Sequence, residues 1–281
     1  MPKKRILLMM VIVLVTFTTA GCIDLFYIPG IGVSPDGSQL YFLQPFDLTG
    51  ESSSNEVQFA SAPFNGTSTP IMEAFGAFTV NPASGAVVFS SGLQEGEIDQ
   101  TFLMKYEDGE ARLFVGPEAF AGNNFLATQL KYSRDGSRLA MTGILAPPEA
   151  DLDVLGDSES FDPTQLGLFD SVVYLVDVNS GALTLVSDPE AAWANTLDWS
   201  PDGRYIAYNG WLDSNADGLI STGGGFASMA GGNTGGVSDG SQIHIYDTSS
   251  GETTNIDGAG TAYAPTWVSN NQLAYVEVDS S

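Results

Sequence analysis

The residues best suited to ligand chemistry lie in one short acidic segment. Residues 213–220 read Asp-Ser-Asn-Ala-Asp-Gly-Leu-Ile, with oxygen-bearing side chains at alternate positions. Such spacing lets several oxygens surround one hard cation, while Gly218 permits the sharp turn and the Leu219 carbonyl points inward. In an EF-hand loop the twelfth position is a bidentate Glu, and here it is Gly224. The segment therefore predicts calcium ligation, with an ion-free Asp/Asn/Gly turn as the alternative; its ligands would be Asp213, Asn215, Asp217 and the Leu219 backbone carbonyl.

Catalytic chemistry has little support among the other residue types. His244 is the only histidine and stands inside an alternating strand-like run, where a structural role is expected rather than that of a general base. The sequence has no Gly-x-Ser-x-Gly, no phosphate-binding loop and no Cys/His metal pair. Paired carboxylates could form a glycosidase-like site, but among 34 acidic residues such pairs carry little information. The acidic stretch Pro148–Asp162 is expected to be a solvated loop, with a second cation site as the alternative.

The net charge of −25 excludes two classes of ligand. All 34 acidic residues follow Cys22, whereas Lys3, Lys4 and Arg5 precede it. Such a surface repels nucleic acid and anionic lipid headgroups, and it attracts cations, basic peptides and divalent metals.

The N-terminus reads as a targeting segment. Three basic residues precede the apolar run Ile6–Val15, and small residues follow it, which is typical of a secretory signal and too short for a membrane span. The ending Thr19-Ala-Gly-Cys22 resembles the bacterial lipobox, with Thr19 where Leu or Val is usual. The resemblance implies removal of residues 1–21, a lipid on the Cys22 sulfur and a chain facing outside the cytoplasm. The alternative is an ordinary signal and a secreted protein with one free thiol, because Cys22 is the only cysteine.

A repeated segment must position these residues. Five stretches align with one another, roughly 50 to 70 residues apart, and such a period indicates an array or a propeller. The clearest copy is Trp199-Ser-Pro-Asp-Gly-Arg-Tyr-Ile-Ala-Tyr208. Its residues predict the end of one strand, a tight turn, and the start of a second strand with alternating apolar residues. The five copies begin at Val33, Val80, Tyr132, Trp199 and Trp267.

Each of the first four copies is followed by a second predicted hairpin, which gives four strands per repeat, as in a propeller blade. The third strands are expected at Val57–Ala62, Thr101–Tyr106, Val172–Val178 and Gln242–Asp247. No helix is expected after the signal. The fold prediction is all-β: a β-propeller of four-stranded blades with about five repeat units, the last incomplete.

The Trp-Ser-Pro-Asp-Gly-Arg signature resembles the WD-like repeats of TolB-type β-propellers, over nearly all of residues 30–281. The resemblance implies that Asp239, just before a third strand, completes the calcium shell. The matching places of Trp199 and Trp267 in the repeat predict that both pack between blades, with stacking on a sugar or peptide ligand as the alternative. The expected boundaries are a signal at 1–21, a tether or closing strand at 22–29, and blades at about 30–75, 76–118, 127–188, 194–257 and, in part, 263–281.

These observations lead to one functional expectation and two rivals. We expect a membrane-anchored, extracytoplasmic lipoprotein that binds an envelope or extracellular protein or peptide, with calcium and no organic cofactor, and that is not an enzyme. The first rival is an extracellular enzyme that processes glycans or peptides with carboxylates on the long-loop face. The second is an inactive remnant of a larger propeller protein. Convergent buried acids with raised pKa would favour an enzyme, and a solvated acidic rim would favour binding.

Overall fold

The computed structural model describes residues 31–45, 57–74, 77–94, 98–146, 170–187, 196–211, 241–256 and 261–278. This part of the chain is all-β, and its one helical element is the single 3-10 turn η1 (Pro117–Phe120). None of its helices is long and apolar enough to cross a bilayer. The predicted signal and the segment 22–29 lie outside the described residues.

The strands form four antiparallel sheets of four strands and a fifth sheet of two. Within each sheet every strand pairs with the next one along the chain. The first sheet holds β1 (Ile31–Val33), β2 (Gln39–Pro45), β3 (Val57–Pro63) and β4 (Thr69–Glu73). The second holds β5 (Phe78–Val80), β6 (Val87–Gln94), β7 (Ile98–Glu107) and β8 (Glu110–Val115). The third holds β9 (Asn124–Tyr132), β10 (Arg138–Ala146), β11 (Asp170–Asp177) and β12 (Leu183–Leu185). The fourth holds β13 (Leu197–Trp199), β14 (Tyr205–Trp211), β15 (Ser241–Asp247) and β16 (Glu252–Ile256), and the fifth holds β17 (Thr261–Ser269) and β18 (Gln272–Val278).

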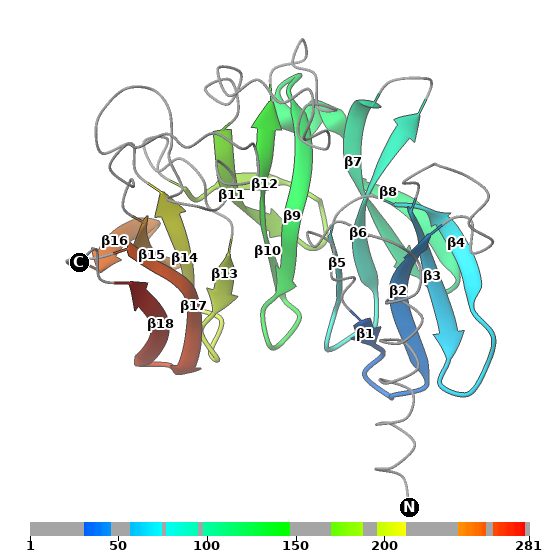
Figure 1. Cartoon of the computed structure of the whole chain (residues 1–281), viewed down its shortest axis with the longest axis horizontal. Coiled ribbons are helices and arrows are strands. Elements are labelled where there is room, and N and C mark those ends of the chain that lie inside the picture. The colour runs from blue at the N-terminus through cyan, green and yellow to red at the C-terminus, as the bar shows by residue number, and fades with distance from the viewer. Residues whose placement is uncertain are drawn as a thin grey trace, which may run out of the picture.

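The five sheets follow one another in a propeller-like fan (Figure 1). The first strands of successive sheets contact each other, β1 with β5, β5 with β9, β9 with β13 and β13 with β17. Among the described residues no strand pairing joins the first sheet to the fifth, so the fan is not closed by hydrogen bonds. All four predicted third strands are confirmed, as β3, β7, β11 and β15.

Two kinds of tight turn shape the hairpins. In the first kind a Ser begins the turn and a Gly stands three residues later, as in Ser34–Gln39, Ser133–Arg138 and Ser200–Tyr205. In the second kind an Asp or Asn begins the turn and a Gly stands four residues later, as in Asp177–Ala182 and Asp247–Glu252. The β5–β6 hairpin departs from its repeat equivalents, because Asn81 gives it a turn of the second kind.

The hairpins between first and second strands, and between third and fourth strands, leave the same end of each sheet. This follows from the up-and-down antiparallel order of the strands. We call this end of the molecule the turn face; in Figure 1 its β9–β10, β13–β14 and β17–β18 hairpins point downward. Connections from second to third strands, and from one sheet to the next, leave from the opposite end.

The core lies between neighbouring sheets, so the middle strands are buried on both faces. In β14, for example, Ile206, Ala207 and Tyr208 are all inaccessible to solvent. Trp199 is 5% exposed and packs with Ile206 and Tyr208, while Trp267 packs against a smaller cluster beside Ile243. The predicted packing role of both tryptophans is confirmed.

The η1 turn was not predicted from the sequence. Its Phe120 is buried and stacks on Phe125 of β9, with ring centroids 4.5 Å apart. Pro117 stands at its N-terminal end, where proline suits a helical start. One turn is too short for a helical period to be visible in the sequence, so the packing of Phe120 is its main support.

Candidate binding site

The structure does not place the site residues predicted from the sequence. Cys22, Asp213, Asn215, Asp217, Leu219 and Asp239 lie outside the described residues, as does the acidic stretch 148–162. Within the part of the chain that is described, no group of three or more His, Cys, Asp or Glu side chains is arranged to hold a metal ion. Lipidation and calcium binding therefore stay predictions.

His244 lies in β15, as predicted, and it belongs to the core. Its side chain is 3% exposed, and its ring stacks on Tyr208 of β14 with centroids 5.0 Å apart and planes within 11° of parallel. A buried, stacked imidazole in mid-strand supports the predicted structural role.

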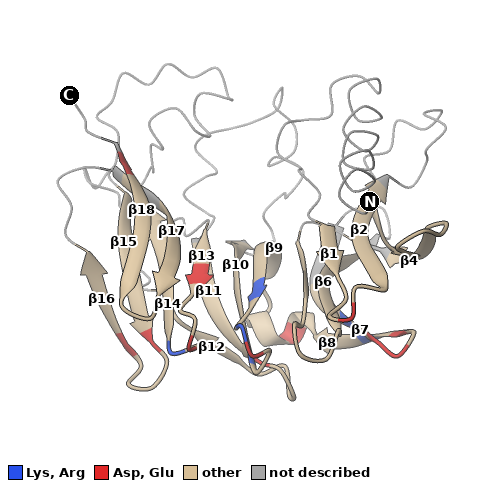
Figure 2. Cartoon of the chain, turned by 90° about the horizontal axis from the view of Figure 1, so that it is seen from below, with Lys and Arg blue, Asp and Glu red and all other residues tan. Residues whose placement is uncertain are grey.

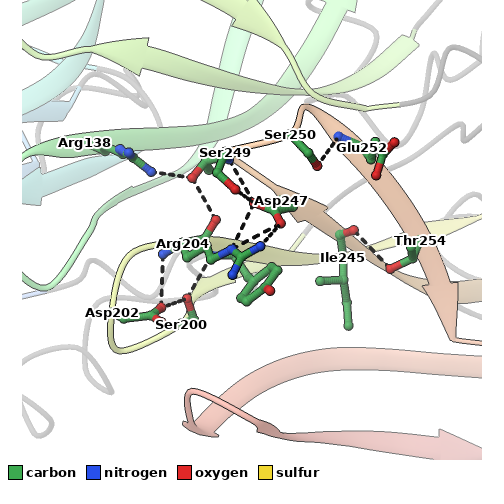
Figure 3. A network of polar contacts seen from close by, with 12 residues as sticks. Arg138, Ser200, Asp202, Arg204, Ile245, Asp247, Ser249, Ser250, Glu252 and Thr254 are labelled. Carbon is green, nitrogen blue, oxygen red and sulfur yellow. Dashed lines mark hydrogen bonds and ion pairs between the residues drawn. The ribbon is translucent and has the colours of Figure 1, made fainter.

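A polar hollow of about 160 Å³ lies on the turn face between the third and fourth sheets. Three hairpins surround it: β9–β10, β13–β14 and β15–β16. We call the residues that line this hollow the junction site (Figure 3). Its lining residues are Asp135, Ser137, Arg138, Asp202, Gly203, Arg204, Thr248 and Ser249.

The Ser-x-Asp-Gly turns hold the two wall carboxylates in place. The Ser133 hydroxyl donates to Asp135 over 2.7 Å, and the backbone N–H of Ser137 donates to the same carboxylate. The Ser200 hydroxyl likewise donates to Asp202 over 2.6 Å, and so does the backbone N–H of Arg204. Hydrogen bonds from serine side chains, together with these backbone donors, lower the pKa of both carboxyl groups.

Arg138 connects the two sheets across the hollow. Its Nη1 donates to the carbonyl of Gly203 over 3.0 Å and also to the Thr248 hydroxyl. The Thr248 hydroxyl in turn donates to the Arg204 carbonyl over 2.8 Å. Arg138 also lines the hollow, and its Nε and Nη2 donors make no hydrogen bond to the described residues.

Arg204 is committed to an ion pair within the fourth sheet. Its guanidinium donates to Asp247, with Nη2 2.6 Å from Oδ2, and it lies over the Tyr205 ring at 4.8 Å. The hydrogen bond from Arg204, followed by those from Ser249, holds the pKa of Asp247 well below its usual range. Tyr205 stacks on Trp267 at 5.9 Å, which extends the contact to the fifth sheet.

A second set of polar contacts joins the first strands of the third, fourth and fifth sheets. Lys131 forms an ion pair of 2.7 Å with Asp198, whose other oxygen accepts the backbone N–H of Trp267 over 2.7 Å. The indole N–H of Trp199 donates to the Lys131 carbonyl over 2.9 Å. Sequence reasoning missed this pair, although each member directly precedes the aromatic residue that opens its repeat.

Charge is distributed unevenly between the two ends of the sheets. All six Lys and Arg that follow Cys22 lie in or near the hairpins of the turn face, and Figure 2 looks onto this side. They are Lys105, Arg112, Lys131, Arg134, Arg138 and Arg204. The stretches that leave from the opposite end contain more than half of the 34 acidic residues and no basic one. The turn face is therefore much less negative than the chain as a whole.

Comparisons with known proteins define the class of fold. No family model matches the chain, and no curated protein matches it. Among solved structures, puromycin hydrolase is similar with a TM-score of 0.54 and 12% identity, over 88% of this chain and 35% of that one. Oligogalacturonate lyase from Vibrio parahaemolyticus is similar with a TM-score of 0.52 and 14% identity, over 88% of this chain and 57% of that one.

A putative TolB from Agrobacterium tumefaciens covers 90% of this chain and 70% of its own, at 15% identity, but its TM-score of 0.46 is too low to support an argument. At these identities the likenesses show the fold alone: the chain is an all-β protein of propeller-like architecture. The chain spans 35% and 57% of the hydrolase and the lyase, so no activity of those whole proteins follows for it.

Proposed function

We propose that this chain is a TolB-like β-propeller scaffold that binds a protein or peptide of the cell envelope and carries out no chemistry of its own. In this proposal the repeats are blades, about five in number, and the last is incomplete. The lipobox-like ending supports anchoring through Cys22, with the scaffold facing outside the cytoplasm. The spacing of residues 213–219, with Asp239, supports one calcium ion that stabilises the fourth unit.

The observation that carries the proposal is that the carboxyl groups of the turn face are held in their ionised form. Every described carboxyl group with a resolved shift has a lowered pKa, because hydroxyl, backbone or guanidinium donors of its own hairpin or of the neighbouring one bind the ionised form. Asp36 is an example, with a pKa of about 2. A carboxylate held this way cannot supply a proton at neutral pH, whereas it can attract and position a ligand. A solvated rim of this kind supports binding.

The junction site supports a peptide as the ligand. Arg138 offers two unused donor positions, which suit a peptide carbonyl or carboxylate. Asp135 and Asp202, on the same walls, suit an ammonium or guanidinium group a few ångströms away. A hollow of about 160 Å³ accommodates one side chain or chain end rather than a large cofactor.

The alternative function is an enzyme that processes glycans or peptides. Among the similar folds are a puromycin hydrolase and an oligogalacturonate lyase, which is the observation that keeps this alternative in view. Its catalytic carboxylates would belong to the long-loop side, where the acidic stretches lie outside the described residues.

The test uses the full chain with Cys22→Ser, a peptide library of defined sequence, and two matched variants. Arg138→Gln removes the unused donors of the hollow, and Arg112→Gln removes an arginine of the same face that pairs with Glu107 away from the hollow. We expect peptides retained by the parent chain to bind at least tenfold more weakly to Arg138→Gln and with unchanged affinity to Arg112→Gln. A cooperative melting transition in each chain confirms that the variants fold. Equal affinity for all three chains would refute the site, and new peptide fragments in the mass spectrum would establish the enzyme instead.

A further inference from the structure

Among the described residues the fifth sheet contains two strands, whereas each of the other four sheets contains four. β18 pairs with β17 along one side, and no described strand pairs with its other side. It lies at the end of the fan, as Figure 1 shows in dark red. An edge strand of seven residues presents a row of backbone N–H and C=O groups that can pair with another extended segment.

The composition of this edge favours association. Residues 261–278 contain one charged residue, Glu277, in a chain that is 15% charged. Tyr275 and Val276 of β18 are 37% and 46% exposed, which leaves apolar side chains beside the free backbone edge. β18 contains neither Lys nor Pro, the residues that commonly prevent pairing at sheet edges.

We propose that β18 pairs antiparallel with β18 of a second copy of this chain. The combined sheet would run β17–β18–β18–β17 and would contain four strands, the number found in each of the other sheets. Full-length pairing of Gln272–Val278 with itself places the two-fold axis at Tyr275. The two Tyr275 rings then face each other, and Ala274 lies opposite Val276 of the second copy.

The charge of the molecule favours a second copy at this edge over other surfaces for self-association. Two chains of net charge −25 repel each other wherever their acidic regions approach. The 261–278 hairpin contains one charged residue, so contact here brings few like charges together. In the symmetric register each Glu277 lies opposite Leu273 of the other copy, and the two glutamates stand at opposite ends of the sheet.

This interface is separate from the junction site, because the hollow lies between the third and fourth sheets and involves no residue of β18. Loss of pairing would leave peptide binding intact, and loss of peptide binding would leave pairing intact. The two proposals can therefore fail independently.

The first experiment measures the mass of the full chain with Cys22→Ser by sedimentation at increasing concentration. A small interface of paired edges is expected to dissociate on the order of micromolar concentration. Val276→Lys places a charge beside the free edge and should weaken the dimer at least tenfold. Val268→Lys makes the same substitution at a 65% exposed site of β17, away from the free edge, and should leave the dimer unchanged. Because both variants reduce the negative charge equally, a difference between them cannot come from long-range repulsion.

The second experiment locates the two-fold axis. In the Cys22→Ser background, a single cysteine is introduced at Ala274, Tyr275 or Val276, and the chain is exposed to a mild oxidant. Two introduced cysteines come within disulfide distance only where a residue lies opposite the same residue of the second copy. In the proposed register that position is Tyr275, so Tyr275→Cys should cross-link fastest. A chain that stays monomeric at about 100 µM, or equal dimer strength in the two lysine variants, would overturn the proposal. Amide-exchange protection of β18 in a monomer would place another segment of the same chain on the edge and would equally overturn it.

Discussion

Three glycines of the turn face share one backbone conformation and differ in their surroundings, which allows a matched mutational test. Gly37, Gly136 and Gly203 all have φ of +71°, in the left-handed region. An alanine there costs about 1–2 kcal/mol in backbone strain, partly offset by about 0.4–1 kcal/mol from restriction of the unfolded chain. A methyl group at Gly37 would meet no atom within 4 Å, and at Gly203 it would make an ordinary contact of 3.6 Å with Ser133. We therefore expect each of these alanine variants to lose about 1 kcal/mol.

Gly136→Ala should be more damaging, because its methyl group would lie 2.2 Å from the Asn81 side-chain oxygen. Asn81 is buried and cannot move aside easily. Its oxygen accepts the backbone N–H groups of Ala83 and Ser84, and its Nδ2 donates to the Gly136 carbonyl over 2.8 Å. Each hydrogen bond of this kind contributes about 0.5–1.5 kcal/mol, so losing two of them adds about 1–3 kcal/mol to the strain.

The assay is urea or guanidinium unfolding of the three alanine variants and the parent chain, read as the free energy of unfolding at constant slope. The expected order is a small and equal loss for Gly37→Ala and Gly203→Ala and about 2–4 kcal/mol for Gly136→Ala. If all three variants lose the same free energy, the contact between Asn81 and the β9–β10 turn does not hold the second and third sheets together. Combining Gly136→Ala with Asn81→Ala is the check on the expected result, because removal of the Asn81 side chain should abolish most of the extra loss at Gly136.

Three further predictions concern the anchor, the ion and acid stability. Wild-type chain expressed in a lipoprotein-processing bacterium should enter the detergent phase of an extraction, and Cys22→Ser should not; identical partitioning would exclude the lipid. Millimolar calcium at ten times Kd should stabilise the chain by ~1.4 kcal/mol and raise its melting temperature by a few degrees, whereas equal magnesium, or calcium with Asp217→Ala, should not. Lowered carboxyl pKa values add stability that is complete above the ordinary pKa of 3.8 and is lost as pH falls toward about 2, where Asp36 titrates. The denaturant concentration at the unfolding midpoint should therefore decrease as the pH is lowered below about 4, and it should decrease less steeply in Asp36→Asn. A denaturant midpoint that does not change with pH would contradict the lowered pKa values.

The local elements of the fold could be predicted from the sequence, because short-range chemistry determines them. Ser-x-Asp-Gly places a glycine where the chain needs positive φ, and alternating apolar residues then set the strand register. The turns at Gly37, Gly136 and Gly203 and the third strands of the four-stranded sheets follow from these signals. The β5–β6 turn has a different structure from the turns with which it aligns. Its Asn-x-x-Ser-Gly pattern resembles Asp177-x-x-Ser-Gly and Asp247-x-x-Ser-Gly, so a comparison across both kinds of hairpin would have identified it.

The junction site could not be predicted, because it depends on which sheets become neighbours. Arg138 and Thr248 are far apart in the sequence, and the repeat that contains Arg138 does not indicate a partner for its side chain. Their contact requires the third and fourth sheets to pack with their turns at one level, a property of the assembled fan rather than of any segment. The Lys131–Asp198 pair has the same origin, since each residue is unremarkable within its own strand.

The repeat also explains why a binding site would arise at this junction rather than between the other sheets. The Ser-x-Asp-Gly turn occurs three times, but the second residue after its glycine, which begins the second strand, differs: it is Gln39, Arg138 or Tyr205. Only the third sheet places a guanidinium at this position, and it reaches the Gly203 carbonyl of the next turn. The arginine at this one position of the repeat thus adds hydrogen-bond donors beside the carboxylates of the turns. In the proposed function, this arrangement on the less negative end of a strongly acidic chain would match both the acceptors and the cationic groups of an approaching peptide.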